Sequence, residues 1–195
     1  MSVRRTRAQQ VEDNDVRLLA AARKVFVRSG FHAASLDAVA REAGLTKGAV
    51  YARYESKADL MFALLEDRVT ARAGQMISVA VPESREKTAG AIASQFAALV
   101  AKDREWSLLV VEFRVHVARD RALNARFRAL NELLVANVSA LATKAGVAPG
   151  VAADLARAAV ALANGFALER WADPRSFPDS LLEHAAQALV RGMTP

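Results

Sequence analysis

Polar, basic and small residues gather in one short stretch of the sequence, between Thr46 and Arg53. Thr46 and Lys47 stand at the start of a predicted helix, where their side chains can reach phosphates or base edges. The N-terminus of a helix itself favours a phosphate. Gly48 and Ala49 are small enough to let the helix approach base edges closely. This pattern predicts a surface that binds double-stranded DNA.

Two short helices must hold this surface in place. The sequence predicts one helix over Leu36–Ala43, with Ser35 as its N-cap. It predicts a second helix over Lys47–Tyr54, with Thr46 as its N-cap. Gly44 breaks the chain between them, because glycine commonly ends a helix.

The spacing of small and aliphatic residues in these two helices matches a helix-turn-helix. Ala40 is small where the second helix packs over the first, Gly44 tolerates a positive φ in the turn, and Val50 closes the core. An ordinary helix pair with a glycine turn would show the same spacing. The polar outer face is therefore what favours DNA binding.

Helical periodicity of apolar residues continues along the rest of the chain, with Gly and Pro at the breaks. We expect nine helices and no strand, so the predicted fold class is all-α. The predicted helices are Asp15–Ser29, Leu36–Ala43, Lys47–Tyr54, Lys57–Val79, Glu83–Ala101, Arg104–Ala118, Arg121–Ala145, Val151–Trp171 and Asp179–Arg191. Residues 1–14 are predicted to form a flexible basic arm.

The net charge of +6 is concentrated in the first third of the chain. Residues 1–57 carry eleven Lys or Arg against six Asp or Glu, whereas residues 58–195 carry sixteen against fifteen. A localised positive field suits a polyphosphate partner. Arg4, Arg5 and Arg7 of the arm are expected to enter a minor groove or to follow phosphates.

The sequence gives no support to an enzyme or a membrane protein. It has three His and no Cys, and it shows neither a Gly-rich phosphate loop nor a nucleophile elbow. We therefore expect no catalytic residue, no metal site and no cofactor. The N-terminus lacks the apolar stretch of a signal peptide, and the apolar runs are too short to span a bilayer. A soluble, cytoplasmic protein is expected.

Residues 17–65 resemble the DNA-binding domain of the TetR family. The stretch AARKVFVRSGFHAASLDAVAREAGLTKGAVYARYESKADLMFALLE follows the family pattern from its first helix into its fourth. The residues that carry the resemblance are Phe26, Gly30, Ser35, Gly48, Tyr51, Tyr54, Lys57 and Leu60. Tyr54 stands where the family more often has Phe. The resemblance implies a DNA-binding domain over residues 15–60 and an effector-binding and dimerisation domain over residues 61–195.

The resemblance also assigns roles to individual residues. It implies that Tyr51 donates its hydroxyl to a phosphate and that Lys57, at the start of the fourth helix, binds another. It places Thr46, Lys47 and Arg53 against the major groove or its backbone edges. The predicted DNA-contacting residues are Ser35, Thr46, Lys47, Gly48, Ala49, Tyr51, Arg53, Tyr54 and Lys57.

The C-terminal helices are expected, from the same resemblance, to enclose a ligand cavity and to form a four-helix dimer interface. Bulky or polar residues among small aliphatic ones suit a small apolar or aromatic effector, although core packing accounts for each aromatic residue as well. These candidate ligand-binding residues are Phe96, Trp106, Phe113, His116, Phe127 and Phe166. Glu112 and His116 stand at i and i+4, as a metal pair or an effector anchor would. We favour an intrahelical salt bridge, because two ligands alone rarely hold a metal.

These features together predict a sequence-specific transcriptional regulator, in the form of a homodimeric repressor that binds a palindromic operator and is released by a ligand. The helix-turn-helix regions of the two protomers (the reading heads), about one DNA turn apart, would fit successive major grooves. An effector bound between the fourth and eighth helices would move the fourth helix and so change the separation of the two reading heads. Two alternatives stay open: a ligand-responsive activator, and a helical interaction protein with a vestigial DNA motif.

Overall fold

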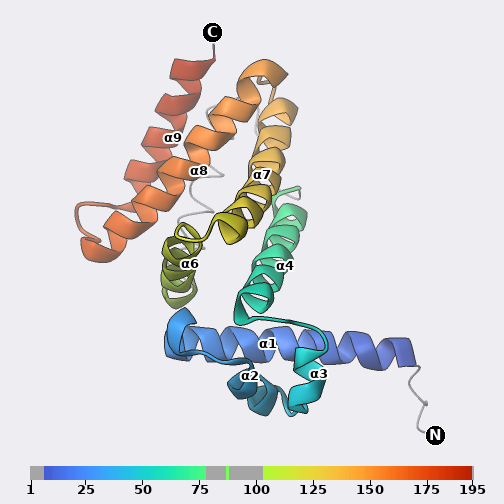
Figure 1. Ribbon diagram of the computed structural model, residues 1–195. Coiled ribbons are helices and arrows are strands. Elements are labelled where there is room, and N and C mark those ends of the chain that lie inside the picture. Colours follow the sequence, from blue (N-terminus) through green and yellow to red (C-terminus); the bar gives the residue numbers. More distant parts are fainter. Residues whose placement is uncertain (1–6, 78–86, 88–102, 195) are drawn as a thin grey trace, which may run out of the picture. The chain divides into compact units, whose positions relative to one another are not determined.

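A computed structural model describes residues 7–77, 87 and 103–194. Within these residues the chain forms eight helices and no strand (Figure 1), which confirms the predicted all-α class. Apart from Lys87, the predicted helix over residues 83–101 lies outside the described residues, as do Arg4, Arg5 and Phe96. The chain divides into two compact units, one of residues 1–68 with 108–127 and one of residues 69–107 with 128–195.

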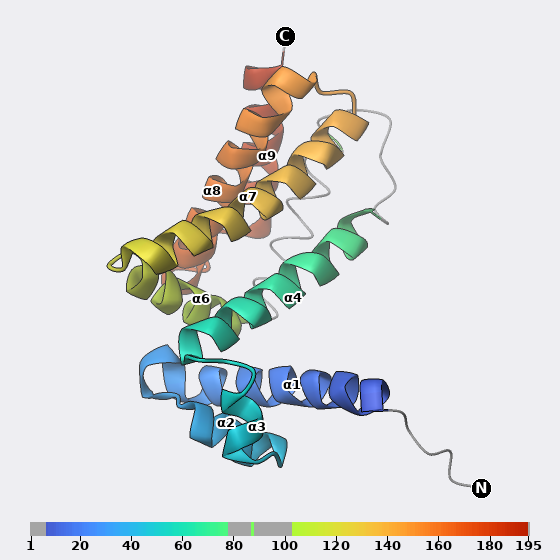
Figure 2. The ribbon, with the colours of Figure 1, turned by 45° about the vertical axis from the view of Figure 1, so that its right-hand side comes forward.

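The first unit is built on three N-terminal helices. They are α1 (Arg7–Ala33), α2 (Leu36–Ala43) and α3 (Lys47–Tyr51). Figures 1 and 2 both show α2 and α3 on the same side of α1. The unit also contains the first half of α4 (Lys57–Ile77), most of α6 (Arg104–Val117) and the start of α7 (Arg121–Lys144).

Helix α1 begins at Arg7, so the prediction of a helix start at Asp15 after a non-helical arm is wrong for residues 7–14. These residues are polar but contain no Gly or Pro, and Arg, Ala, Gln and Glu are good helix formers. The predicted break at Gly30 is confirmed, since its φ of 73° and ψ of 168° are not helical. One further helical turn follows the break and ends at Ala33.

Helix α2 has the predicted bounds, whereas some other helix ends differ from the predicted ones by a few residues. Helix α3 ends at Tyr51 instead of Tyr54, although the Tyr54 N–H still donates to the Val50 carbonyl over 3.0 Å. Helix α8 (Pro149–Ala172) starts two residues before the predicted Val151. The earlier start has a simple cause, because proline suits the first turn of a helix, where its missing N–H costs nothing.

The second unit contains α8 and α9 (Asp179–Met193), which lie side by side in both views (Figure 2). Phe166 of α8 and Leu182 of α9 form one buried cluster between them. Leu155 of α8 and Val190 of α9 belong to a second cluster near the other ends of the two helices. Among the described residues, α8 alone is long and apolar enough to cross a membrane by length and composition, which differs from the sequence expectation.

A capping box starts α4. The Ser56 Oγ accepts from the Asp59 N–H over 3.1 Å, and the Asp59 carboxylate accepts from the Ser56 N–H over 3.0 Å. Arg126 of α7 donates to the same carboxylate. These hydrogen bonds hold the pKa of Asp59 below its ordinary value of 3.8, and the one with the Ser56 side chain contributes most.

The Asp59→Asn substitution is expected to lower the free energy of unfolding by about 1 kcal/mol at pH 7. The pKa of Asp59 is lower in the folded than in the unfolded state, so the ionised carboxylate stabilises the folded protein. This contribution is complete above the ordinary pKa and is lost as the pH falls through the folded pKa. The difference between variant and parent should therefore become smaller in acid. Urea unfolding at pH 7 and at about pH 2.5 measures it, and an equal difference at both values would contradict the assignment.

Candidate nucleic-acid interface

The turn between α2 and α3 is a Schellman motif centred on Gly44. Gly44 has a φ of 65° and a ψ of 33°, the left-handed conformation that glycine adopts without strain. The Leu45 N–H donates to the Ala40 carbonyl over 2.9 Å, and the Gly44 N–H donates to the Arg41 carbonyl over 3.2 Å. This pattern ends α2 and turns the chain toward α3, as the position of the glycine predicted.

Both helices begin at the predicted N-caps. The Ser35 Oγ accepts from the Ala38 N–H and the Thr46 Oγ1 accepts from the Ala49 N–H, each over 3.2 Å. Leu45, also expected on the apolar inner face, is only half-buried in the turn. The other inner-face residues are buried: Leu36, Val39, Ala40, Ala43 and Val50. The structure therefore confirms a helix-turn-helix packed against α1.

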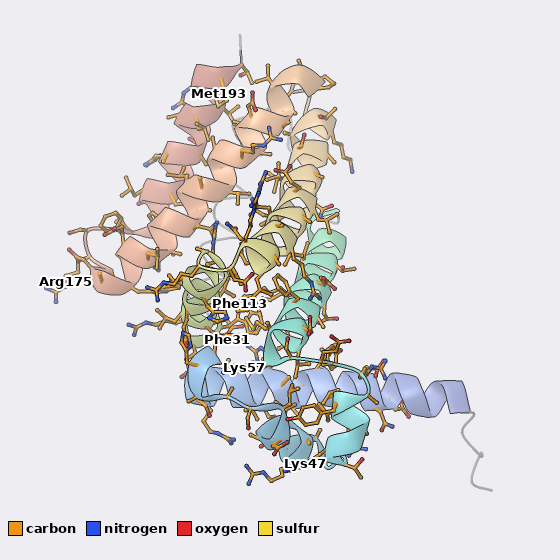
Figure 3. The ribbon with its side chains drawn as sticks, in the orientation of Figure 1. Phe31, Lys47, Lys57, Phe113, Arg175 and Met193 are labelled. Carbon is orange, nitrogen blue, oxygen red and sulfur yellow. The ribbon has the colours of Figure 1, made fainter. Side chains whose placement is uncertain are left out.

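The predicted contact residues of α3 lie on its solvent side. Residues 46–49 are exposed, and 51% of the Tyr51 side chain is accessible to solvent. Figure 3 shows Lys47 on this side, well away from Phe31 and Phe113 of the same unit. A large aromatic ring left exposed at a helix surface contributes little to the core, so its position suits a binding surface.

The basic residues of this surface have acidic partners that the sequence analysis missed. The Lys47 Nζ donates to the Asp37 carboxylate of α2. The Arg53 guanidinium donates to the Asp15 carboxylate of α1. The hydrogen bond from Lys47, followed by smaller contributions that include a hydrogen bond from Tyr51, holds the pKa of Asp37 below its ordinary value.

Arg17 of α1 is a further residue that sequence reasoning missed. Its Nη2 donates to the Ala43 carbonyl over 2.8 Å and so satisfies a carbonyl at the C-terminus of α2. A Cβ on Gly44 would come within 3.3 Å of the same Nη2. The arginine therefore fixes the end of α2 on α1, at the turn that leads into α3.

Lys57 of α4 makes contacts that differ from the phosphate role implied by the resemblance. Its Nζ donates to the carbonyls of His32, over 2.6 Å, and Ala34, over 3.3 Å. The same Nζ lies 4.9 Å from the centre of the Phe31 ring. Two of its three N–H donors are thus engaged by the turn between α1 and α2, which leaves one donor for another partner.

Glu112 of α6 binds the same turn from its other end. Its Oε2 accepts from the Phe31 N–H and its Oε1 from the His32 N–H, each over 3.1 Å. These N–H groups follow the break at Gly30, so the carboxylate caps a helical turn of another segment. The expected salt bridge to His116 is wrong, because the histidine nitrogen nearest to the Glu112 carboxylate is the His32 Nε2, which lies 4.0 Å from Oε1.

The described candidate ligand-binding residues are distributed over both compact units. Phe113, His116 and Phe127 come together in the first unit, with ring-centre distances of 6.3 Å and 6.4 Å from Phe113. Trp106 is buried in the second unit, and Phe166 belongs to the cluster between α8 and α9. The Phe113 side chain is 0% exposed, as a core residue would be.

Two family models match this sequence. Residues 18–64 match the model described as bacterial regulatory proteins of the tetR family. Residues 83–195 match the model described as the tetracyclin repressor-like C-terminal domain. The two matches together cover both the helix-turn-helix and most of the second unit.

Named relatives are similar to this chain over only part of their length. The chain is 41% identical over 64 residues to the HTH-type transcriptional regulator SrpR of Pseudomonas putida, which is 33% of this chain and 30% of that protein. It is 44% identical over 52 residues to the HTH-type transcriptional activator FasR of Mycolicibacterium smegmatis, 27% of this chain and 24% of that protein. The matched segments thus span less than a third of either relative.

A solved structure resembles the whole chain. A transcriptional regulator from Rhodococcus sp. Rha1 superimposes with a TM-score of 0.68, with 27% sequence identity, over 91% of this chain and 94% of that one. The likeness covers 91% of this chain, which therefore has the fold of a transcriptional regulator.

Proposed function

Because this chain belongs to the TetR family of DNA-binding transcriptional regulators, we propose that it is a repressor released by a small molecule. It binds a palindromic operator as a homodimer, with α3 of each protomer in a major groove. The observation that carries the proposal is the capped helix-turn-helix with a buried inner face and an exposed Tyr51. The protein acts on DNA in the cytoplasm and is not an enzyme.

The proposed DNA contacts follow from where the side chains lie. Thr46, Lys47, Gly48 and Ala49 form the exposed start of α3 and meet base edges or phosphates. Tyr51 donates its hydroxyl to a phosphate. The remaining proposed contacts are Ser35, Arg53, Tyr54 and Lys57. Lys57 uses its third N–H for a phosphate, while its other two hold the turn before α2.

The surface between protomers is proposed on α8 and α9. Leu168 of α8 and Leu181 of α9 are exposed in the protomer, and α8 carries a long apolar sequence of which only part is buried. A helix pair with such a face gains free energy by packing against the same pair of a second copy. The dimer then sets the distance between two reading heads.

The effector is proposed to be a small apolar or aromatic molecule that binds in the C-terminal part of the chain, without a metal or a cofactor. Of the candidate residues, Trp106 and Phe166 lie in the second unit, whereas Phe113, His116 and Phe127 lie in the first. The direction of regulation follows the family pattern of repression. Because the chain is similar to the activator FasR, activation is the second candidate function. If the protein does not bind DNA, its helix-turn-helix is a vestigial motif.

The Tyr51→Phe substitution is expected to weaken DNA binding about tenfold for every sequence tested, because it removes one hydroxyl donor to a phosphate. Lys57→Ala should weaken binding in the same general way, whereas Lys47→Ala should also change base preference. Mobility shift on DNA flanking the gene, at two salt concentrations, measures all three. Lys144→Ala, which removes an exposed charge at the end of α7, is the matched control. Parental affinity in all three variants would refute the contact assignment.

A further inference from the structure

Asp37 lies beside the proposed DNA contacts but plays no part in the core. It is in the first turn of α2, where its carboxylate accepts from the Lys47 Nζ. Its side chain is 37% exposed and that of Lys47 is 66% exposed, so the ion pair is on the surface of the reading head. A hydrogen bond from Tyr51 also contributes to lowering the pKa of Asp37. The Asp37 carboxylate therefore engages Lys47, one of the residues proposed to meet DNA.

This ion pair opposes a simple electrostatic attraction to DNA. Lys47 is the single basic residue of α3, and Asp37 neutralises it. Non-specific binding to DNA is almost entirely electrostatic, since each ammonium that meets a phosphate releases a counterion. A lysine held by a carboxylate contributes less of this energy, and the carboxylate itself repels phosphates. The pair thus weakens binding to any sequence that offers phosphates alone.

We propose that Asp37 determines the sequence specificity of this reading head, by holding Lys47 away from the phosphates of non-operator DNA. The proposal rests on the placement of α3 in the major groove. On the operator, base edges compete with Asp37 for Lys47 and Tyr51 meets its phosphate, so these contacts offset the loss of the ion pair. On other sequences those contacts are missing, and the neutralised lysine does not replace them.

The same helix provides a matched control. Glu42 lies at the other end of α2, where its carboxylate pairs with Lys24 and Arg28 of α1, each at 3.7 Å. Glu42→Gln removes the same charge from the same helix as Asp37→Asn. A uniform electrostatic effect would therefore appear equally in both variants, whereas release of Lys47 appears only in Asp37→Asn.

The test uses the full chain and two labelled duplexes, one from the DNA that flanks the gene and one with the same bases shuffled. Fluorescence anisotropy over a range of salt gives both affinities and their salt slopes. Asp37→Asn should bind the shuffled duplex about fivefold more tightly, with a salt slope steeper by about 0.9 for each protomer that contacts DNA. The preference for the flanking duplex should fall by a similar factor. The added substitution Lys47→Gln should remove the gain.

Each alternative result has a distinct meaning. Unchanged or weaker binding of Asp37→Asn to the shuffled duplex would overturn the proposal, as would an equal gain in Glu42→Gln or a gain that survives Lys47→Gln. A thermal melt of each variant, including Asp37→Ser as a second substitution, shows whether a loss of DNA affinity comes from unfolding. If the parent protein prefers neither duplex, the proposed operator function fails instead, which separates the two failures.

Discussion

Gly30→Ala is expected to lower the free energy of unfolding by about 2–4 kcal/mol. Gly30 has a φ of 73° and a ψ of 168°, a conformation that residues with a Cβ essentially never adopt. An added Cβ would also come within 3.1 Å of the Glu112 Oε2. The substitution therefore strains the backbone and pushes the carboxylate away from the N–H groups of Phe31 and His32.

The effect should extend to DNA binding, because charges of opposite sign hold the turn after Gly30 at its two ends. Glu112 caps the N–H groups of this turn, and Lys57 binds the carbonyls of His32 and Ala34. An anion at the N-terminal end and a cation at the C-terminal end both stabilise a helical turn. This turn leads directly to Ser35, the N-cap of α2, so its displacement moves the helix-turn-helix.

Denaturant unfolding and the mobility shift described above measure these two effects of Gly30→Ala. Gly150→Ala is the control, because Gly150 has an ordinary φ and a Cβ added there meets nothing within 4 Å. It should change stability by less than about 1 kcal/mol. Equal stability of the two variants would show that neither the conformation of Gly30 nor its contact with Glu112 matters.

Phe113→Ala is expected to cost about 3–5 kcal/mol of stability, as is usual for a fully buried phenylalanine. The ring of Phe113 lies at the centre of an aromatic cluster in the first unit (Figure 3). Its centre is 4.8 Å from that of Phe31, 5.1 Å from that of Phe62 and 6.4 Å from that of Phe127. Removing it leaves a cavity between α1, α4 and α6.

This prediction distinguishes a core residue from a ligand-binding one. Truncating a phenylalanine that lines an effector cavity would lower the free energy of unfolding only slightly. Truncating one that fills the core would lower it by several kcal/mol. Phe113→Leu should retain much of the stability, since it leaves a smaller void. Phe177→Ala, at a half-buried ring beside Phe166, is the control and should cost less. A melting temperature within about 2 °C of the parent for Phe113→Ala would contradict the core assignment.

The helix-turn-helix could be predicted from the sequence because its determinants are local. Ser35 and Thr46 each accept a hydrogen bond from an N–H three residues further on, and Gly44 closes a turn whose hydrogen bonds span at most five residues. Such contacts depend on residue type and spacing, both of which are visible in the sequence. The eight described helices follow from periodicity for the same reason, while their ends shift because polar helix formers extend α1 to Arg7.

The partners of the charged residues were decided by the tertiary structure alone. Glu112 binds a turn about eighty residues earlier in the chain, Arg17 satisfies the end of α2, and Lys57 binds two carbonyls before that helix. A lysine or a glutamate carries the same charge wherever it stands, and only the packing of helices determines which group comes within hydrogen-bond distance. The sequence by itself therefore determined the type of reading head, and the fold determined which of its charges are free to meet DNA.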